Sequence, residues 1–386
     1  MITYPQLPWS AGDLPVRLRP AIEEYRNEAD DARRLPQPLL DQLCAHGAFR
    51  LNAPRELGGF ELPVASTMNL IEQLARIDGS VAWIVWNLNL GVGAAFLSER
   101  SVARIWSGGP DPLIAHSSQP GLLFKDVEGY HLSGEWKLVS GADSAQWFAL
   151  LGIVMDEGQP RMTELGPDVR WCVVPRSSVA VHDTWHATAL RGTDSNTVIA
   201  ANVAVDNDMI VAPHAAARID RPLFRVLITN QLTSGGAAIL LGMAQSAIDE
   251  AIALVRTKKG LDGVALEQQP RVQGIVGQAT ARLGAARTFL LTTIGVLDAA
   301  ATANRAATEA ERGAVRGALC YAAETARAVL TSMYDLAGSS VLYESSRLGR
   351  LFRDGHAAAQ HLILSPAHYE LAGRTAMGLP GNDPAL

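Results

Sequence analysis

Residues 223–257 read LFRVLITNQLTSGGAAILLGMAQSAIDEAIALVRT, an alanine-rich stretch without a proline. The same composition continues along the chain, and between Pro222 and Pro366 the only proline is Pro270. Long helices require both features, because proline breaks a helix interior and alanine has the highest helix propensity. We therefore predict a C-terminal four-helix bundle, with helices over residues 223–257, 269–302, 307–336 and 346–364.

A strand-like region precedes this bundle. Short β-branched and aromatic runs, divided by glycine, proline and aspartate, extend from Gly108 to about Pro213. They predict an antiparallel barrel or sandwich of about six strands or more. Before them, residues 14–110 carry apolar residues at helical spacing. The expected fold class is α+β, with an N-terminal helical domain (1–110), a middle antiparallel β-domain (111–215) and the C-terminal four-helix bundle (216–386).

Composition narrows the class of protein. The chain has 386 residues, of which 48% are apolar and 19% charged, and its formal net charge is -6. It has no basic run, so we expect no nucleic-acid partner. It shows neither a secretory signal nor a run of about 18 uncharged apolar residues, so we expect a cytoplasmic protein with no membrane partner. His182 and His186 fall in strand and loop sequence, and we expect no metal there.

Four segments, spread over most of the chain, resemble the acyl-CoA dehydrogenase superfamily. They are DDARRLPQPLLDQLCAHGAFRLNAPRELGGFEL (30–62), GEWKLVSGADSAQWFALLG (134–152), HDTWHATALRGTDSNTVIAANVAV (182–205) and SSRLGRLFRDGHAAAQH (345–361). The resemblance implies a flavoprotein built from helices, then a β-domain, then a helical bundle.

Two patterns resemble one branch of that superfamily, the group D flavin monooxygenases. They are G-x-W-x-x-x-S-G at Gly134, Trp136, Ser140 and Gly141, and the spacing of Arg353 and Asp354 from His361. This resemblance implies a two-component enzyme that takes reduced FMN or FAD from a separate flavin reductase and uses O2 on a small-molecule substrate. The sequence has no GxGxxG after a strand, so we expect no direct NAD(P)H binding.

The carboxylate positions disfavour acyl-CoA dehydrogenation, which needs a carboxylate base beside the flavin. In the superfamily's common pattern this glutamate lies eight residues after the aspartate of Arg-Asp, where this chain has Leu362. The other place is the first bundle helix, and no carboxylate occurs between Asp220 and Asp249. By resemblance, His361 is the predicted base or proton shuttle, and its reference pKa of ~6.5 suits that role.

The other candidate residues are assigned by the same resemblance. Ser140 is expected to hydrogen-bond the flavin as a catalytic residue. Asn89 stands where the oxygenases often carry a second histidine, and an amide there can hydrogen-bond a substrate but cannot take its proton. The predicted flavin contacts are Trp136, Ser140, Arg191, Thr193, Ser195, Arg256, Gly338 and Ser339.

The sequence leaves four functions open. The first, which we favour, is hydroxylation of a small aromatic or polycyclic substrate. The second is oxidation of a nitrogen, as in the amino-sugar nitrososynthases that share this architecture. The third is an atypical acyl-CoA dehydrogenase, or an oxidase or oxygenase of CoA esters. The fourth is a structural subunit without activity. The sequence does not choose between FMN and FAD.

Two arrangements in space are also predicted. The apolar, weakly charged bundle helices predict a homotetramer, assembled as a dimer of dimers through the bundles. A seven-residue spacing would place Asp354 and His361 on one helical face. The flavin is expected between residues 136–140 and the bundle, with residues 191–195 nearby.

Overall fold

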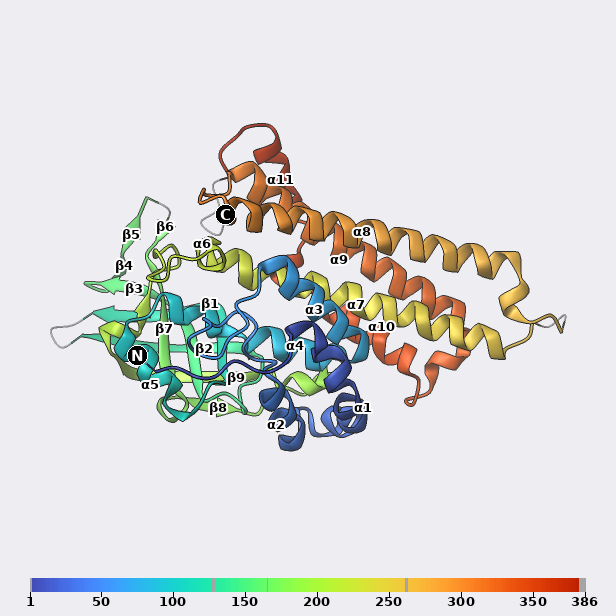
Figure 1. Cartoon of the computed structure of the whole chain (residues 1–386), viewed down its shortest axis with the longest axis horizontal. Helices are drawn as coiled ribbons and strands as arrows, with labels where there is room; N and C mark the ends of the chain where they lie inside the picture. The colour runs from blue at the N-terminus through green and yellow to red at the C-terminus, as the bar shows by residue number, and fades with distance from the viewer. Residues whose placement is uncertain (1, 126–128, 165, 261–262, 382–386) are drawn as a thin grey trace.

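Figure 1 shows a computed structural model of the chain, which describes residues 2–125, 129–164, 166–260 and 263–381. Helices come first, then a sheet, then long helices, which is the predicted α+β order. The N-terminal helices are α1 (Leu14–Ala32), α2 (Gln37–His46), α3 (Val64–Ile77), α4 (Gly79–Asn87) and α5 (Glu99–Ile105). The strands are β1 (Ile114–Lys125), β2 (Tyr130–Val139), β3 (Trp147–Asp156), β4 (Gln159–Pro160), β5 (Met162–Thr163), β6 (Gly166–Pro167), β7 (Val169–Pro175), β8 (Ala180–His182), β9 (Asn196–Val205) and β10 (Ile210–Val211). The C-terminal helices are α6 (Pro222–Arg225), α7 (Ile228–Thr257), α8 (Pro270–Thr302), α9 (Glu309–Ala337), α10 (Arg347–Ala358) and α11 (His368–Ala376).

The main sheet has the strand order β10-β7-β3-β1-β2-β9-β8, with β4 paired to β3. Its pairs are antiparallel except β1 with β3, which are parallel. The prediction of a wholly antiparallel domain was therefore wrong at this pair. The reason lies in the connection: β2 returns along one edge of β1, and β3 then enters at the other edge in the same direction as β1. This places the start of β1 in the middle of the sheet.

Helix α4 packs against α3 and α7 and is buried along its whole length. It begins where the Asp78 side chain accepts a hydrogen bond from the Val81 backbone N–H, and it ends at Asn87. A buried 3-10 segment, Leu90–Ala95, follows it. The apolar sequence around these elements is thus a core segment, and it brings two tryptophans next to the bundle.

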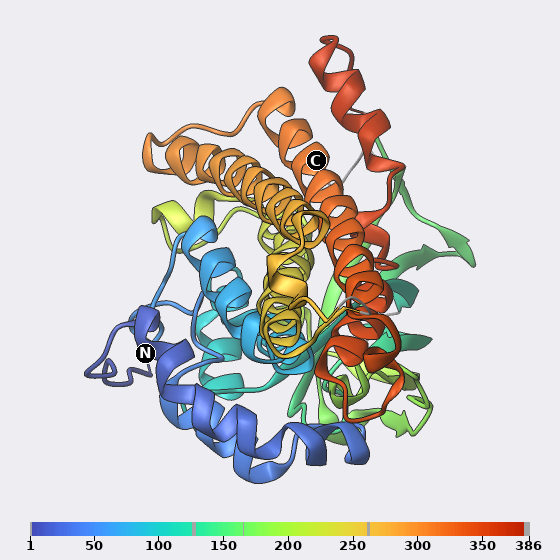
Figure 2. The ribbon, with the colours of Figure 1, turned by 90° about the vertical axis from the view of Figure 1, so that its right-hand side faces the viewer.

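Helix α7 is the centre of the bundle. It packs against α3, α4, α8, α9 and α10, and Figure 2, which looks along the helices, shows it surrounded by them. The predicted helix over 223–257 is broken, because Val226 and Leu227 are extended between α6 and α7. The break lets the Gln231 side chain donate hydrogen bonds to the carbonyls of Leu223 and Val226.

The last predicted helix, 346–364, is also shorter than expected. Helix α10 ends at Ala358, and a 3-10 turn, Leu362–Leu364, follows after an extended residue at His361. Tertiary packing explains this ending, since Leu364 is buried and lies against Gly236 of α7. His361 therefore does not share a helical face with Asp354, and that prediction was wrong.

Two helices, α7 and α8, are long and apolar enough to cross a membrane by length and composition alone. In the most apolar window of α7, 67% of the residues are buried inside the protein, as in a core helix of a soluble protein. The corresponding share in α8 is 33%, so α8 presents an apolar face outward. That face bears on how the chain assembles.

Candidate functional site

A chain of buried hydroxyl groups lies where β2 ends. The Ser140 Oγ is 2.9 Å from the Ser195 Oγ, which is 2.8 Å from the Thr193 Oγ1. The Trp83 indole N–H donates to Ser140 at 3.0 Å, and the Thr193 hydroxyl donates to the Leu190 carbonyl. The structure thus brings together three of the predicted residues, from two separate segments of sequence.

The loop that carries Thr193 and Ser195 is held in a special backbone conformation. Leu190 and Asp194 both lie in the left-handed region, with φ of 48° and 49°. The Leu190 N–H donates a 2.6 Å hydrogen bond to the Asp354 carboxylate of α10. Arg191, predicted to contact the flavin, instead donates to the backbone carbonyls of Asp30 and Ala187. Its guanidinium therefore supports the loop.

The strand end before Ser140 carries an exposed apolar side chain. A β-bulge between Trp136 and Val139 turns Leu138 outward with a φ of 58°, and Leu138 is 65% exposed. An outward leucine next to a chain of hydroxyls suits the apolar face and polar edge of an isoalloxazine ring. The flavin therefore fits the residues present.

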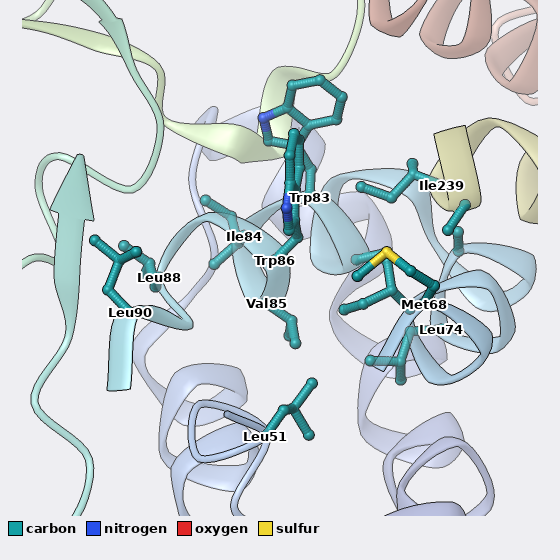
Figure 3. Packing of buried hydrophobic residues seen from close by; sticks show 14 of the residues in the cluster. Leu51, Met68, Leu74, Trp83, Ile84, Val85, Trp86, Leu88, Leu90 and Ile239 are labelled. Carbon is teal, nitrogen blue, oxygen red and sulfur yellow. The ribbon is translucent and has the colours of Figure 1, made fainter. Parts of the chain in front are cut away.

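Two tryptophans and a histidine meet on the bundle side of the hydroxyl chain. Trp83 and Trp86 of α4 stand edge to face, with ring centroids 5.1 Å apart (Figure 3). The His361 ring lies 5.7 Å from Trp83 and 6.0 Å from Trp86. The indole of Trp86 rests in a notch at Gly235, where a β-carbon would stand 2.4 Å from its nitrogen. These contacts place His361 one residue away from Ser140, with Trp83 between them.

The sequence reasoning missed a second histidine in this region. His116, on β1, has its Nδ1 3.1 Å from the Asn87 carbonyl, and its ring centroid is 6.2 Å from that of Trp171. Burial lowers the pKa of His116 to about 4, and the charge on a protonated His361 contributes to this lowering. A histidine inside the strand sequence IAHSS is typical of an ordinary core residue. Only the alternation of inward and outward side chains along β1 indicated that it points inward.

The partners of the two imidazoles assign them opposite tautomers. A carbonyl can only accept, so His116 carries its proton on Nδ1 and presents Nε2 as an acceptor. At His361 the Nδ1 accepts from the Ile363 backbone N–H at 3.4 Å, so the proton sits on Nε2. The His361 side chain reaches solvent, yet surrounding atoms desolvate it and lower its pKa. Both rings are therefore neutral near pH 7, one as an acceptor and one as a donor.

Two predicted contacts have structural roles instead. Trp136 is fully buried, and its indole N–H donates to the Leu151 carbonyl inside the sheet. It cannot shield a flavin, because β-domain residues cover it. The amide of Asn89 donates to the Ala48 carbonyl and accepts from the Asn52 N–H. Asn89 therefore holds the loop after α2, and the rest of its side-chain surface lines a small cavity.

Three further predicted flavin contacts lie at the far end of the bundle. Gly236 on α7 touches Ile363 beside His361, and Arg256 is 20 residues further along the same helix, or about 30 Å. Arg256 is exposed and 3.9 Å from Glu267. Gly338 and Ser339 lie at this same end, because Lys258 contacts the neighbouring Ser340. Within one chain, these residues do not meet Ser140.

Comparison with known proteins follows the same division of the chain. The profile of the acyl-CoA dehydrogenase N-terminal domain matches residues 18–99, and that of the acyl-CoA dehydrogenase C-terminal domain matches residues 234–366. Together they cover more than half of the chain, from the first helix to the last turn of the site. The chain belongs to the acyl-CoA dehydrogenase superfamily.

Relatives within the superfamily align along almost the whole chain. Indole-3-acetate monooxygenase of Pseudomonas putida is 27% identical, covering 92% of this chain and 91% of that protein. The flavin-dependent monooxygenase oxygenase subunit HsaA of Rhodococcus jostii is 25% identical, covering 95% and 98%. A solved 3-HSA hydroxylase from Rhodococcus superposes with a TM-score of 0.90 at 24% identity, covering 98% and 99%. The last comparison confirms the superfamily fold.

Proposed function

We propose that this chain is the oxygenase component of a two-component flavin-dependent monooxygenase. It takes reduced FMN or FAD from a separate reductase and uses O2 to hydroxylate a small aromatic or polycyclic substrate. The observation that carries the proposal is the pair of neutral histidines, His116 and His361, with opposite hydrogen-bonding roles. The names of three relatives support it: an indole-3-acetate monooxygenase, a flavin-dependent monooxygenase oxygenase subunit and the oxygenase component of an FADH2-dependent resorcinol hydroxylase.

The residues available for chemistry favour oxygenation over dehydrogenation. The position of the usual dehydrogenase glutamate is Leu362, which is 78% exposed. The apolar cavity beside His116 is lined by no carboxylate among the residues described. Removal of a proton next to a thioester would therefore lack its base. The acyl-CoA dehydrogenase named in the third alternative therefore has no support in this geometry.

Each residue of the site has a defined task in the proposed reaction. The reduced flavin, when bound, supplies the electrons that activate O2. Ser140, oriented by Trp83 and Ser195, hydrogen-bonds the polar edge of its ring. His361 donates from Nε2 toward the oxygen being transferred and relays a proton to solvent. His116 accepts a hydrogen bond from the substrate and fixes which ring atom is presented.

Oxygen incorporation tests the proposal directly. The purified chain is mixed with an NADH-driven flavin reductase, FMN or FAD, isotopically labelled O2 and a panel of simple aromatics and heteroaromatics. We expect a hydroxylated product that carries one labelled oxygen atom on carbon. Label on nitrogen would instead support the nitrososynthase-like alternative. Desaturation without label, or no oxidation of any panel member, would overturn the proposal.

Assembly is part of the proposal, as a cytoplasmic homotetramer. Helix α8 leaves Phe289 46% exposed, and at Gly274 and Gly277 no described atom lies within 4 Å of where a β-carbon would stand. Such a face allows a helix of a second copy to approach closely. A second copy would also bring its own Arg256, Gly338 and Ser339 to a flavin that they cannot reach within one chain. These residues then bind the flavin phosphates across a subunit interface.

A further inference from the structure

Two cavities border the Leu232 side chain, and His116 lines the larger of them. The larger lies between the β-domain and the start of α7, and its walls include Phe96, His116, Trp171 and Leu232. The smaller lies deeper between α3, α4 and α7, and Leu232 is also part of its wall. The two cavities measure about 60 and 20 Å³, so an aromatic ring enters only if lining side chains such as Leu232, which borders both, move aside.

Neither cavity carries a charge that could pair with an anion. Among the described residues that line them, none is aspartate, glutamate, lysine or arginine. Among these described lining residues His116 is the only titratable group, and burial keeps it neutral by lowering its pKa to about 4. A carboxylate or phosphate placed here would lose its hydration without gaining a counter-charge, which is strongly unfavourable.

The smaller cavity does offer neutral hydrogen-bonding groups. The Trp86 indole N–H and the Gln231 side-chain carbonyl are both buried and have no hydrogen-bond partner among the described residues. Each of these side chains is only 7% exposed. The Trp86 nitrogen lies against Gly235, one helical turn after Gln231, and both side chains line the smaller cavity. Buried polar groups are normally paired, and this pair is suited to a ligand that both accepts and donates.

We infer that the substrate is an uncharged ring compound with a neutral donor–acceptor group such as an amide. The ring lies against His116 and Trp171, which contact each other edge to face, and the neutral group bonds to Trp86 and Gln231. The inference rests on the proposed function, since it assumes that these cavities receive the substrate. It separates this chain from its relative named for indole-3-acetate, which is a carboxylate near neutral pH.

A matched ligand pair tests the inference without turnover. Indole-3-acetamide and indole-3-acetate have nearly the same shape and differ in charge. Calorimetric titration of the full chain at pH 7.5 should show at least about tenfold tighter binding of the amide. A factor of this size corresponds to one hydrogen-bonded pair that is gained and one unpaired buried charge that is avoided. Equal or tighter binding of the acetate would overturn the inference, and so would failure of both ligands to bind. The titration involves no oxygen transfer, so the binding result can be interpreted even if the proposed function fails.

A conservative variant tests the role of the unpartnered indole nitrogen. Trp86→Phe keeps an aromatic ring and removes an N–H that has no protein partner, so no internal hydrogen bond is lost. We expect the affinity for indole-3-acetamide to fall about three- to tenfold, while the affinity for indole, which lacks the side group, stays within about twofold. A parallel loss for both ligands would show a packing effect, and no loss for the amide would contradict the contact; either result overturns this part of the inference.

Discussion

The Asp354 carboxylate accepts a 2.6 Å hydrogen bond from the Leu190 backbone N–H, and this bond joins α10 to the loop that carries Thr193 and Ser195. Leu190 is in the left-handed region, so the bond helps to hold a backbone conformation that leucine seldom adopts. The bundle thereby fixes the position of the hydroxyl chain in the β-domain.

Asp354 makes the stability of the protein depend on pH. Burial raises its pKa to about 7, although the Leu190 amide and Arg350 oppose the rise. The folded state therefore binds this proton more tightly than the unfolded chain, and stability is lost as pH rises from about 4 toward 7. Asp354→Asn keeps the acceptor and removes the titration. Thermal unfolding at pH 5.5, 6.5 and 8 gives the free energy of unfolding of both proteins. This free energy should depend less on pH in the variant, by up to about 1.4 kcal/mol per pH unit. Identical slopes for the two proteins would contradict this.

His361 is expected to be needed for turnover and not for folding, because its side chain is exposed at the site. His361→Ala and His361→Asn should lower turnover roughly 10²–10⁴-fold with little change in thermal midpoint. His368→Ala, seven residues later, serves as the control and should leave turnover unchanged. If either His361 variant kept more than about a tenth of wild-type turnover at saturating reduced flavin, the histidine would be structural.

His361 and His116 should differ in the pH profile of the rate. Desolvation lowers the pKa of His361, so its neutral form is lost only below its ordinary value of 6.5, and we expect an acid limb there. The limb should disappear in His361→Asn. His116, with a pKa of about 4, stays neutral from pH 5 to 9 and contributes no limb in that range. Initial rates of product formation across this range provide the measurement; an acid limb that survives in His361→Asn and vanishes in His116→Gln would reverse the two assignments.

Ser140 should govern how efficiently reduced flavin is used. Ser140→Ala removes the oxygen that Trp83 and Ser195 contact, and with it the proposed bond to the flavin edge. We expect the ratio of product to O2 consumed to fall about tenfold, in line with the loss of one or two hydrogen bonds. Ser144→Ala, on the turn just after Ser140, is the matched control. An unchanged ratio in Ser140→Ala would show that the hydroxyl only supports the loop.

The exposed face of α8 should govern assembly. Phe289→Asp places a charge on that face and is expected to convert the tetramer into smaller species in light scattering at micromolar concentration. Val16→Asp on α1, where Val16 is 77% exposed, is the control and should leave the mass unchanged. A wild-type protein that is monomeric under these conditions would contradict the assembly proposal.

Local sequence signals account for much of this fold and for less of its site. The absence of proline and the abundance of alanine identify α7, α8 and α9, because backbone propensity determines them. The end of α10 at Ala358 has no such signal: the sequence HAAAQHLIL continues helical spacing, and the burial of Leu364 against α7 stops it. Tertiary contacts of this kind cannot be read from one segment alone.

The site residues divide in the same way, into those that the sequence predicts and those that depend on tertiary contacts. Ser140, Thr193 and Ser195 were predicted by resemblance, and the structure brings their hydroxyls together. Trp136 was misplaced because the sequence of a strand does not distinguish a tryptophan buried in the core from one that faces a flavin. His116 was missed because its role depends on β1 lying in the middle of the sheet, which the parallel pairing with β3 creates.

The notch that Gly235 leaves for Trp86 limits how the protein can be stabilised by engineering. Replacing helix glycines with alanine is a common route to heat resistance, and each exchange gains about 1 kcal/mol where space allows. At Gly373 in α11 no described atom lies within 4 Å of the new methyl group, so the exchange suits that position. At Gly235 the methyl group would stand 2.4 Å from the indole and displace Trp86, whose ring also contacts His361. A thermostable variant made without regard to this notch would keep its fold and lose the shape of its binding site.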